Sequence, residues 1–488
     1  MEKGIIIILM LISGVFTLNG QVNSVQAKIN AIQSDNYMKN ASIGFYAVNI
    51  ATGEEIAKLN ENTSLTPASI MKLFTTSTAF QTLGAGHRIK TELLHDGVVD
   101  SNGVLHGNIY IKGYGDPTWG SRFFTKEGHE LDFLKTWVDS IKAFGIKEID
   151  GYVIADGSYY SYDGVPGGWN WTDMGNYYGA GPAGLNIFDN MVYLHFATGA
   201  KSGDSTVLHC IEPHIPNLEY RNEVLTSDKK GDNSYVFGGP FSLDRFVVGT
   251  LPRNEEDFKV KGSIPDPEDF FGYAFTNALE ENGVQVKYCH QTMRKLQLTK
   301  AEKDSLKLKE IHTFRGEKLY KIINEINHRS VNLFAECLLN YLGAQKYGTG
   351  NAWNGTAAVE KYWSARNNMT GFYMNDGSGL SRTNAVSAKH FVDMLKYMST
   401  QKTFESFENS LAQTGKRGTI RSMCANGAGY QRVYGKSGSM NRVRSYAGYV
   451  YSKTGKKIAF TIMFNNFNCS STQVKRMCEG LFNVMASY

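Results

Sequence analysis

A predicted helix that starts with a serine and a lysine one turn apart constrains this chain more than any other feature. The pair belongs to the segment Ser69-Ile70-Met71-Lys72. Upstream, Thr66 suits a helix N-cap and Pro67 suits the first helical position, where the missing N–H of proline costs nothing. The apolar residues up to Leu83 predict a helix with one buried face, and Gly84 can end it.

This serine and this lysine can perform nucleophilic chemistry together. Backbone N–H groups in the first turn of a helix have no intrahelical partner, so Ser69 could attack a carbonyl while its own N–H holds the oxyanion. A neutral Lys72 could accept the serine proton. Ser-x-x-Lys also occurs by chance at Ser227–Lys230 and Ser399–Lys402, which lack the Thr-Pro start and the apolar helix. By itself, the motif at Ser69 fits a capped structural helix as well.

Two further motifs follow downstream. Ser330-Val331-Asn332 lies between the helical patterns Leu319–Asn327 and Leu333–Leu342, so we expect its side chains to project from a helix–helix turn. Lys436-Ser437-Gly438-Ser439 precedes strand-like sequence and leads into a strand. The chain thus carries three motifs in the order Ser-x-x-Lys, Ser-x-Asn and Lys-Ser-Gly.

The ordered triple resembles the motif set of the penicillin-binding proteins and serine β-lactamases. The long separation between Ser69 and Ser330 is typical of one branch of them, the D-alanyl-D-alanine carboxypeptidase/endopeptidases. These are the low-molecular-weight class C penicillin-binding proteins of the PBP4 type, peptidase family S13. Further segments are similar to the GGGDPT, DGSGLSR, GTLR and closing-hairpin motifs of that family: Gly113–Thr118, Asn375–Arg382, Gly418–Arg421, and Ala447–Tyr449 with Phe460–Asn466.

Two literal motif matches are decoys. Ser34-Asp35-Asn36 reads SDN but precedes the serine helix. Lys453-Thr454-Gly455 reads KTG but falls between the strand-like segments Ser445–Tyr451 and Lys457–Asn466, with the composition of a hairpin turn. Lys436 is therefore the better candidate for the third motif.

The resemblance implies an α/β fold of the α+β type. We expect a penicillin-binding-protein transpeptidase or serine β-lactamase-like domain, an antiparallel sheet with helices on it and the serine helix near its centre. Strand-like and helix-like patterns alternate along the chain and predict its division. We expect a signal peptide at 1–20, two parts of this domain at 21–90 and 301–488, and a large strand-rich inserted region at 91–300.

The resemblance also implies a mechanism on a D-Ala-D-X bond of a peptidoglycan peptide. Ser69 would attack the carbonyl, with Lys72 as the base. Ser330, with Lys436 nearby, would pass the proton to the leaving amine. Asn332 would orient the substrate amide and Lys72. The pKa of Lys72 would have to fall, by burial or by a second cation such as Lys436.

The third motif would bind the substrate. Lys436, Ser437 and Ser439 would hold the terminal carboxylate in the strand that contains Gly438. The N–H groups of Ser69 and Ser439 would form the oxyanion hole. β-Lactams would acylate the same serine because they present a similar amide and carboxylate. The expected partners are peptidoglycan stem peptides and β-lactams.

Two other functions remain open at this stage. A β-lactamase would share the triple of motifs, although the long insertion and the DGSGLSR-like segment speak against it. A non-catalytic peptidoglycan-binding protein could have kept the same fold. The choice between terminal D-Ala and cross-links, and the oligomeric state, cannot be read from the sequence.

The N-terminal residues predict export. Lys3 precedes the apolar run Ile5–Phe16, and Leu18-Asn19-Gly20 offers a cleavage point before Gln21. The run is short for a membrane span. We therefore expect a periplasmic protein without a stable membrane span.

Composition excludes several other classes. A net charge of +5 over 488 residues, with no basic tract or P-loop, argues against nucleic-acid binding. No HExxH and no CxxC zinc spacing occurs, and we expect no metal or other cofactor. The six cysteines could pair in an oxidising compartment, but free buried thiols are favoured, above all for Cys337.

The aromatic residues of the inserted region allow two interpretations. Those in Gly167–Trp171 and Asn176–Gly181 could line a glycan or peptide groove, but we favour packing in the region's own core. Asp116-Pro117 predicts a structural turn, and His328 a structural histidine.

Overall fold

The computed structural model of the protein describes residues 24–488, which form two compact units. Unit 1 comprises 24–85, Ile323–Ser330 and Val359–Tyr488. Unit 2 comprises Gly86–Ile322 and Val331–Ala358. The predicted signal peptide lies outside the described residues. The domain boundaries at residues 91 and 300 stay a prediction, and each unit is described by itself below.

Unit 1 contains a six-stranded sheet in which every neighbouring pair is antiparallel. In spatial order the strands are β18 (Ala412–Gln413), β19 (Val433–Met440), β20 (Val443–Tyr451), β21 (Lys457–Asn465), β1 (Ser42–Asn49) and β2 (Glu55–Leu59). The helices of this unit are η1 (Asn36–Met38), η2 (Ala68–Met71), α2 (Lys72–Leu83), α11 (Ala388–Met398), α12 (Phe404–Ser410), η5 (Gly418–Ile420) and α13 (Ser471–Ala486). Two more helices, α8 (Leu319–Arg329) and α10 (Ala352–Ser364), contribute residues to both units.

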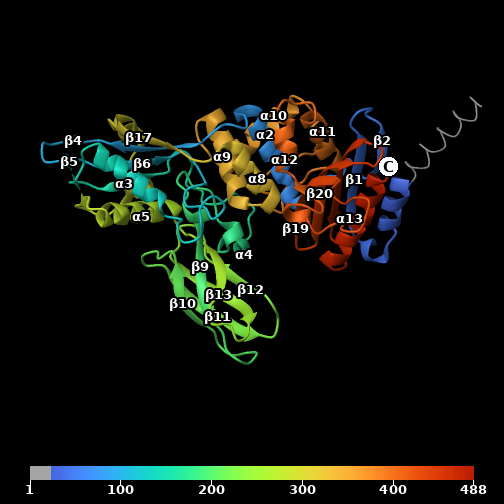
Figure 1. Ribbon diagram of the computed structural model, residues 1–488, viewed down its shortest axis with the longest axis horizontal. Coiled ribbons are helices and arrows are strands. Elements are labelled where there is room, and N and C mark those ends of the chain that lie inside the picture. The colour runs from blue at the N-terminus through green and yellow to red at the C-terminus, as the bar shows by residue number, and fades with distance from the viewer. Residues whose placement is uncertain (1–23) are drawn as a thin grey trace, which may run out of the picture. The chain divides into compact units, whose positions relative to one another are not determined.

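Helices cover both faces of this sheet (Figure 1). The rings of Tyr446 and Phe460 pack edge-on against Phe482 of α13, while the hydroxyl of Tyr449 donates to the carbonyl of Leu395 in α11 at 2.8 Å. Tyr446 and Tyr449 are three residues apart on β20, so they point to opposite faces. Burial on both faces agrees with the central strands, in which every residue from Ser445 to Val450 and from Ile458 to Asn465 is buried.

The serine helix starts differently from the prediction. Thr66 does not cap it: its hydroxyl donates to the carbonyl of Arg382 at 3.4 Å, and its backbone N–H and carbonyl pair with the side chain of Asn465 at 2.9 and 3.1 Å. Ala68 has a positive φ of 49° and diverts the chain away from a regular first turn. A 3₁₀ turn, η2, therefore precedes α2 and holds Ser69. The helix ends at Gly84, as predicted, with a φ of 80°.

Helix α2 is also buried more completely than its sequence suggested. The pattern predicted one buried face, yet every residue from Lys72 to Phe80 is buried. Its hydroxyl residues tolerate this because they bond back to the helix, as Thr76 does to the Lys72 carbonyl at 2.8 Å and Thr78 to the Phe74 carbonyl at 2.7 Å.

Both decoy motifs have structural roles. Asp35 accepts a hydrogen bond from the backbone N–H of Tyr37 and caps η1. Lys453-Thr454-Gly455 forms the turn between β20 and β21. The preferred motif, Lys436–Ser439, lies inside β19 rather than ahead of a strand, because the strand already begins at Val433.

Unit 2 carries four smaller sheets. One has the order β16-β8-β6-β3-β17, a second β15-β7-β5-β4, and two three-stranded sheets are ordered β10-β9-β14 and β11-β13-β12. Their strands are β3 (Lys90–His95), β4 (Val98–Val99), β5 (Val104–His106), β6 (Ile109–Gly113), β7 (Glu148–Ile149), β8 (Val153–Asp156), β9 (Met191–Ala197), β10 (Val207–Glu212), β11 (Glu219–Ser227), β12 (Asn233–Phe237), β13 (Asp244–Pro252), β14 (Phe258–Ser263), β15 (Gln285–Val286), β16 (Gln291–Thr292) and β17 (Lys309–Arg315). Its helices are α3 (Phe133–Ala143), α4 (Trp171–Met174), η3 (Tyr177–Gly179), η4 (Phe188–Asn190), α5 (Pro267–Glu281), α6 (Met293–Leu296), α7 (Lys300–Ser305) and α9 (Asn332–Tyr347).

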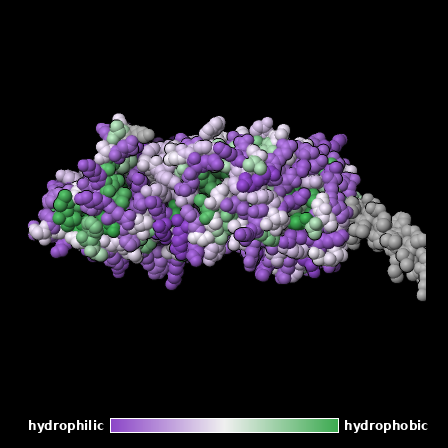
Figure 2. Space-filling model, turned by 90° about the horizontal axis from the view of Figure 1, so that it is seen from above, coloured by the Kyte–Doolittle hydropathy of each residue, from purple (hydrophilic) through white to green (hydrophobic). Residues whose placement is uncertain are grey.

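Aromatic stacking organises the main core of unit 2. Trp137 of α3 lies parallel to Phe314 of β17, with ring centroids 4.5 Å apart, and against Phe271 of α5 at 5.5 Å. Helices α3 and α5 pack together beside the strands (Figure 1). On the face of the molecule in Figure 2, hydrophilic residues predominate and hydrophobic residues gather in separate groups.

The aromatic residues of the inserted region do not all serve the core. Trp169 is buried, as the favoured interpretation requires. Trp171 and Tyr177 are 52% and 44% exposed, so that interpretation is wrong for them. Asp116 is buried and accepts hydrogen bonds from the N–H and hydroxyl of Thr118 at 2.8 and 2.6 Å, which makes Asp116-Pro117 the structural turn that was predicted.

The six cysteines are free thiols in the described chain, and Cys337 is buried inside α9 as expected. Among residues 24–488, no helix is both long enough and apolar enough to cross a membrane.

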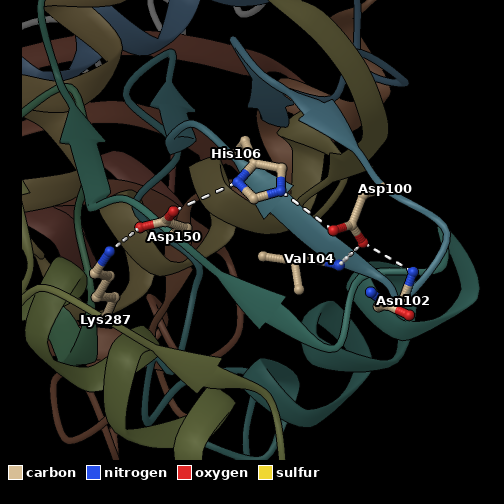
Figure 3. Close-up of polar contacts among 6 residues, drawn as sticks. All are labelled: Asp100, Asn102, Val104, His106, Asp150 and Lys287. Atoms are coloured by element: carbon tan, nitrogen blue, oxygen red, sulfur yellow. Dashed lines mark hydrogen bonds and ion pairs between the residues drawn. The ribbon is translucent and has the colours of Figure 1, made fainter.

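An imidazole bridges two carboxylates at the sheet β15-β7-β5-β4 (Figure 3). The Nε2 atom of His106 lies 3.2 Å from a carboxylate oxygen of Asp100, and its Nδ1 atom lies 3.4 Å from Asp150. Asp150 also accepts from Lys287 at 2.6 Å, and Asp100 accepts from the backbone N–H of Val104 at 3.0 Å. These bonds tie the β4–β5 hairpin to β7 and β15.

We expect His106 to make the stability of unit 2 depend on pH. Hydrogen bonds that His106 donates to Asp100 first, and then to Asp150, raise the pKa of His106 above its ordinary value of about 6.5. A raised pKa in the folded state means that the stabilisation is complete below pH ~6.5 and is lost as the pH rises through the folded-state pKa. Urea unfolding of His106→Gln and wild type from pH 5.5 to 8 should show the variant less stable at acidic pH only.

A matched control is His129→Gln. His129 is exposed and pairs with Asp132, three residues along the chain, away from the four-stranded sheet. Because His129→Gln leaves both His106 pairs in place, the loss of stability at acidic pH that is expected for His106→Gln should be absent. A constant difference between His106→Gln and wild type at every pH would contradict the expectation.

Candidate active site

Ser69 and Lys72 meet at the start of the buried helix. The Nζ atom of Lys72 lies 3.0 Å from the Oγ atom of Ser69 and donates to the carbonyl of Ser378 at 2.7 Å. The Lys72 side chain has no exposed surface, whereas Ser69 is partly exposed. A nucleophile that reaches solvent thus has a buried amine at hydrogen-bond distance, as general base catalysis requires.

Ser330 and Lys436 form a second pair in unit 1. Ser330 follows α8 with a φ of 65°, a conformation rare for serine that turns the chain between α8 and α9. The Nζ atom of Lys436 lies 2.9 Å from the Ser330 Oγ atom and 2.7 Å from the carbonyl of Ser437. The prediction of a helix–helix turn at Ser330 is confirmed.

Burial dominates the electrostatics of Lys436. Its side chain is completely buried, and this burial lowers the pKa well below the ordinary lysine value. The charge of Lys72 lowers the Lys436 pKa further. Two lysine amines in one dry region thus oppose each other's protonation.

Strand β19 leaves one edge open beside these residues. It pairs with β20 along its whole length, whereas β18 pairs only with Tyr434 and Gly435. Beyond that point, no strand of the described chain pairs with the outer edge of Ser437–Met440. Such an edge can add an extended peptide by backbone hydrogen bonds.

The side chains along this edge fit the same purpose. The hydroxyl of Ser437 donates to Thr419 Oγ1 at 2.7 Å, and Ser439 is exposed. A Cβ atom on Gly438 would overlap the hydroxyl of Ser445 and lie only 3.0 Å from the backbone N of Ser69. Glycine at this position lets β19 approach the turn that holds Ser69.

Asn332, the last member of the Ser-x-Asn motif, belongs to unit 2. It is the first residue of α9, and its Nδ2 atom donates to the carbonyl of Tyr178 at 2.8 Å. His328, two residues before Ser330, lies 3.1 and 3.2 Å from the carbonyls of Asn409 and Leu411, which agrees with a structural role.

Two features of the site escaped the sequence reasoning. The Ser378 carbonyl contacts Lys72, and the Thr419 hydroxyl contacts Ser437. Both residues lie in segments that the family resemblance had already marked, Asn375–Arg382 and Gly418–Arg421. The signal was therefore present, but without a chemical role attached to it.

Comparison with known proteins decides the family. The model of a family described as D-Ala-D-Ala carboxypeptidase 3 (S13) matches residues 25–486. The chain belongs to the S13 family. The resemblance inferred from the motifs is thereby confirmed.

Curated relatives of this S13 chain are similar over most of their length. A D-alanyl-D-alanine carboxypeptidase of Actinomadura sp. (strain R39) is 28% identical over 459 residues, which cover 91% of this chain and 81% of the relative. The D-alanyl-D-alanine carboxypeptidase DacB of Haemophilus influenzae is 24% identical over 442 residues, with 89% and 88% covered.

A solved structure shares the fold of the S13 chain. The crystal structure of penicillin binding protein 4 (dacB) from Haemophilus influenzae superimposes with a TM-score of 0.76 at 22% identity, covering 96% of this chain and 99% of that one. A second structure of that protein, complexed with a β-lactam, gives a TM-score of 0.73 at 21% identity, with the same two shares covered. The predicted fold class is confirmed.

Replacing Gly438 by alanine should damage both stability and the site. The added methyl group would overlap Ser445 and press on the Pro67 carbonyl, 2.7 Å away, so we expect a loss of about 1–3 kcal/mol in the free energy of unfolding. Equilibrium urea unfolding measures this loss.

Gly480→Ala serves as its control in the same unit. A Cβ atom there would meet only the flexible end of the Lys28 side chain, and alanine suits the interior of α13. Its stability should equal or exceed that of wild type. Equal stability of Gly438→Ala and wild type would show that β19 can shift to make room.

Proposed function

We propose that the protein is a serine-type D-Ala-D-Ala carboxypeptidase that acts on peptidoglycan peptides through an acyl-enzyme on Ser69. One observation carries the proposal: in a member of the S13 family, the Ser69 hydroxyl lies 3.0 Å from the fully buried amine of Lys72. The partners of each side chain suggest its role.

Acylation starts with proton transfer from Ser69 to Lys72. The Oγ atom forms a bond to the carbonyl carbon of the penultimate D-Ala, and neutral Lys72 takes the hydroxyl proton. A neutral amine is required here. The burial of Lys72, and the presence of Lys436 as a second amine in unit 1, both favour a state with fewer protons.

Departure of the terminal D-Ala needs a proton on its nitrogen. Ser330 gives its hydroxyl proton to this amine as the C–N bond breaks and takes up the proton that Lys72 had accepted, with the Lys436 amine 2.9 Å away. Water then attacks the ester carbonyl, Lys72 takes a proton from it, and this proton passes to Ser69 Oγ as the ester bond breaks and the shortened peptide leaves. Asn332 orients the substrate amide in this scheme, as the family motif implies.

The open edge of β19 binds the end of the substrate. Lys436, Ser437 and Ser439 attract and hold the terminal carboxylate, while the N–H groups of Ser69 and Ser439 form the oxyanion hole. The close approach allowed by Gly438 supports this assignment, because it brings the backbone of β19 beside the N–H of Ser69.

The same geometry would accept a β-lactam, whose strained amide and carboxylate imitate the end of the peptide. Hydrolysis of cross-links would give an additional endopeptidase activity with identical chemistry. The predicted signal peptide directs this enzyme to the periplasm, where its substrate lies.

Labelling with a fluorescent penicillin tests the nucleophile. Wild type should form a stable covalent adduct. Ser69→Ala should form none and should lose the release of D-Ala from a D-Ala-D-Ala peptide by at least about 10³-fold, because no other group is placed to attack. Gel fluorescence and a D-alanine assay measure these two properties.

Ser399→Ala provides the matched control, because Ser399 belongs to a chance Ser-x-x-Lys and only donates to the Lys396 carbonyl. Its labelling should equal wild type. A folded wild type without any adduct would favour a non-catalytic binding protein. A transient adduct with rapid consumption of penicillin would favour a β-lactamase.

The two lysine-hydroxyl-glycine motifs should respond differently to the same change. Lys436→Met removes a buried amine but keeps the volume, and we expect the rate of acylation to fall by about 10²–10³-fold. Lys453→Met changes an exposed residue in the β20–β21 turn and should have no effect. Stopped-flow labelling measures the acylation rate of each variant. Equal rates for Lys436→Met and Lys453→Met would make Lys453 a candidate for the third motif again.

A further inference from the structure

The Asn375–Arg382 segment lies at the site without a part in the chemistry above. Its central acid, Asp376, is completely buried in unit 1. One carboxylate oxygen accepts from the backbone N–H of Gly379 at 2.7 Å and from the side-chain amide of Asn384 at 2.8 Å. The other accepts from the backbone N–H of Ser381 at 2.6 Å. These bonds fold Asp376–Ser381 into a compact loop around one carboxylate, called the 376–381 loop below.

The 376–381 loop contacts the serine helix at consecutive residues. The Ser378 carbonyl accepts from Lys72 Nζ at 2.7 Å, and the Gly377 carbonyl accepts from the Thr75 hydroxyl at 2.9 Å. Gly379, with a φ of 80°, packs so closely on Ala68 that a Cβ atom would overlap the Ala68 carbonyl. The loop therefore braces the turn before Ser69 and the helix after it.

The Ser378 carbonyl constrains how Lys72 presents its lone pair. A neutral amine has two N–H bonds and one lone pair, in fixed tetrahedral directions. With one N–H held by the Ser378 carbonyl, rotation about the last side-chain bond is restricted, and the lone pair can stay directed at the Ser69 hydroxyl 3.0 Å away. The position of that carbonyl thus controls the base.

From these contacts we infer that Asp376 is a positioning residue for Lys72, an inference that rests on the proposed function. Its carboxylate holds the loop that places the Ser378 carbonyl, and this carbonyl orients the amine that accepts the proton of Ser69. The acid acts through the loop and not on the substrate.

The chemistry of the carboxylate explains why an acid stands at this position. A carboxylate only accepts hydrogen bonds, and Gly379, Ser381 and Asn384 all donate to it. An asparagine would turn an N–H toward one of these donors, so at least one bond would break and the loop would relax. The shape of the side chain would hardly change.

Asp376→Asn is therefore the decisive variant. Its rate constant for acylation by a fluorescent penicillin should fall about 10–100-fold, because displacement of a catalytic group by about 1 Å has effects of this size. The loss of the carbonyl acceptor also destabilises protonated Lys72, so the acidic limb of the pH–rate profile should move to lower pH. Lys436, the other buried amine, whose pKa responds to the charge of Lys72, is the same in both proteins.

Two further variants frame the result. Thr75→Val removes only the bond from α2 to the Gly377 carbonyl, and acylation should slow by about 3–10-fold. Ser381→Ala keeps the backbone bond to Asp376 and loses contacts with the hydroxyl and the backbone N–H of Thr383, away from Ser378, so its rate should stay within about twofold of wild type. Circular dichroism melting establishes that each variant is folded.

The outcomes separate this inference from the proposed function. Suppose that wild type is labelled and that Asp376→Asn folds with an unchanged rate and pH profile. This result overturns the inference about Asp376 and leaves the proposed function standing. A slower Asp376→Asn with an unshifted profile indicates a purely structural role and also overturns it. If Asp376→Asn does not fold, a wild-type rate for Thr75→Val overturns the inference and a slower rate supports it. Unlabelled, folded wild type overturns both proposals.

Discussion

The structure of unit 1 depends on the burial of two lysine amines. A charged amine without water is expensive, so each amine must find acceptors within the protein or remain neutral. Lys72 has the Ser69 hydroxyl and the Ser378 carbonyl, and Lys436 has the Ser330 hydroxyl and the Ser437 carbonyl. Two of these bonds link distant segments: Lys72 joins α2 to the 376–381 loop, and Lys436 joins β19 to the end of α8. The hydrogen bonds of these two buried amines therefore connect parts of the chain that are distant in sequence.

Backbone strain concentrates at the same place. Ala68 and Ser330 adopt left-handed conformations that residues with a Cβ atom rarely take, and each stands at or beside a serine of the site. Regular geometry would have placed Ser69 in an ordinary helical turn. The surrounding burial compensates for the strain, because α2 is enclosed on all sides from Lys72 to Phe80. The packing of the core thus holds the hydroxyl groups of Ser69 and Ser330 in positions that an unstrained backbone would not give them.

Sequence reasoning was most successful where chemistry follows residue type and order. The serine helix, the turn at Ser330 and the turn at Lys453–Gly455 could all be predicted from motif order and periodicity. The 3₁₀ turn could not, because a positive φ at alanine has no sequence signature. The role of the Ser378 carbonyl was equally hidden, since backbone acceptors exist at every residue. The roles of the eight predicted site residues stay predictions until they are tested by substitution.

The open edge of β19 has a consequence for the solution behaviour of the protein. An unpaired strand edge can pair with another copy of itself, and proteins usually block such edges with proline, lysine or a bulge. Under the proposed function the edge from Ser437 to Met440 binds a peptide, which excludes those devices. Its glycine and serines have low strand propensity. An edge with this sequence can still bind the backbone of a substrate, but it pairs poorly with a second copy of itself. The low strand propensity would therefore keep the open edge from starting aggregation.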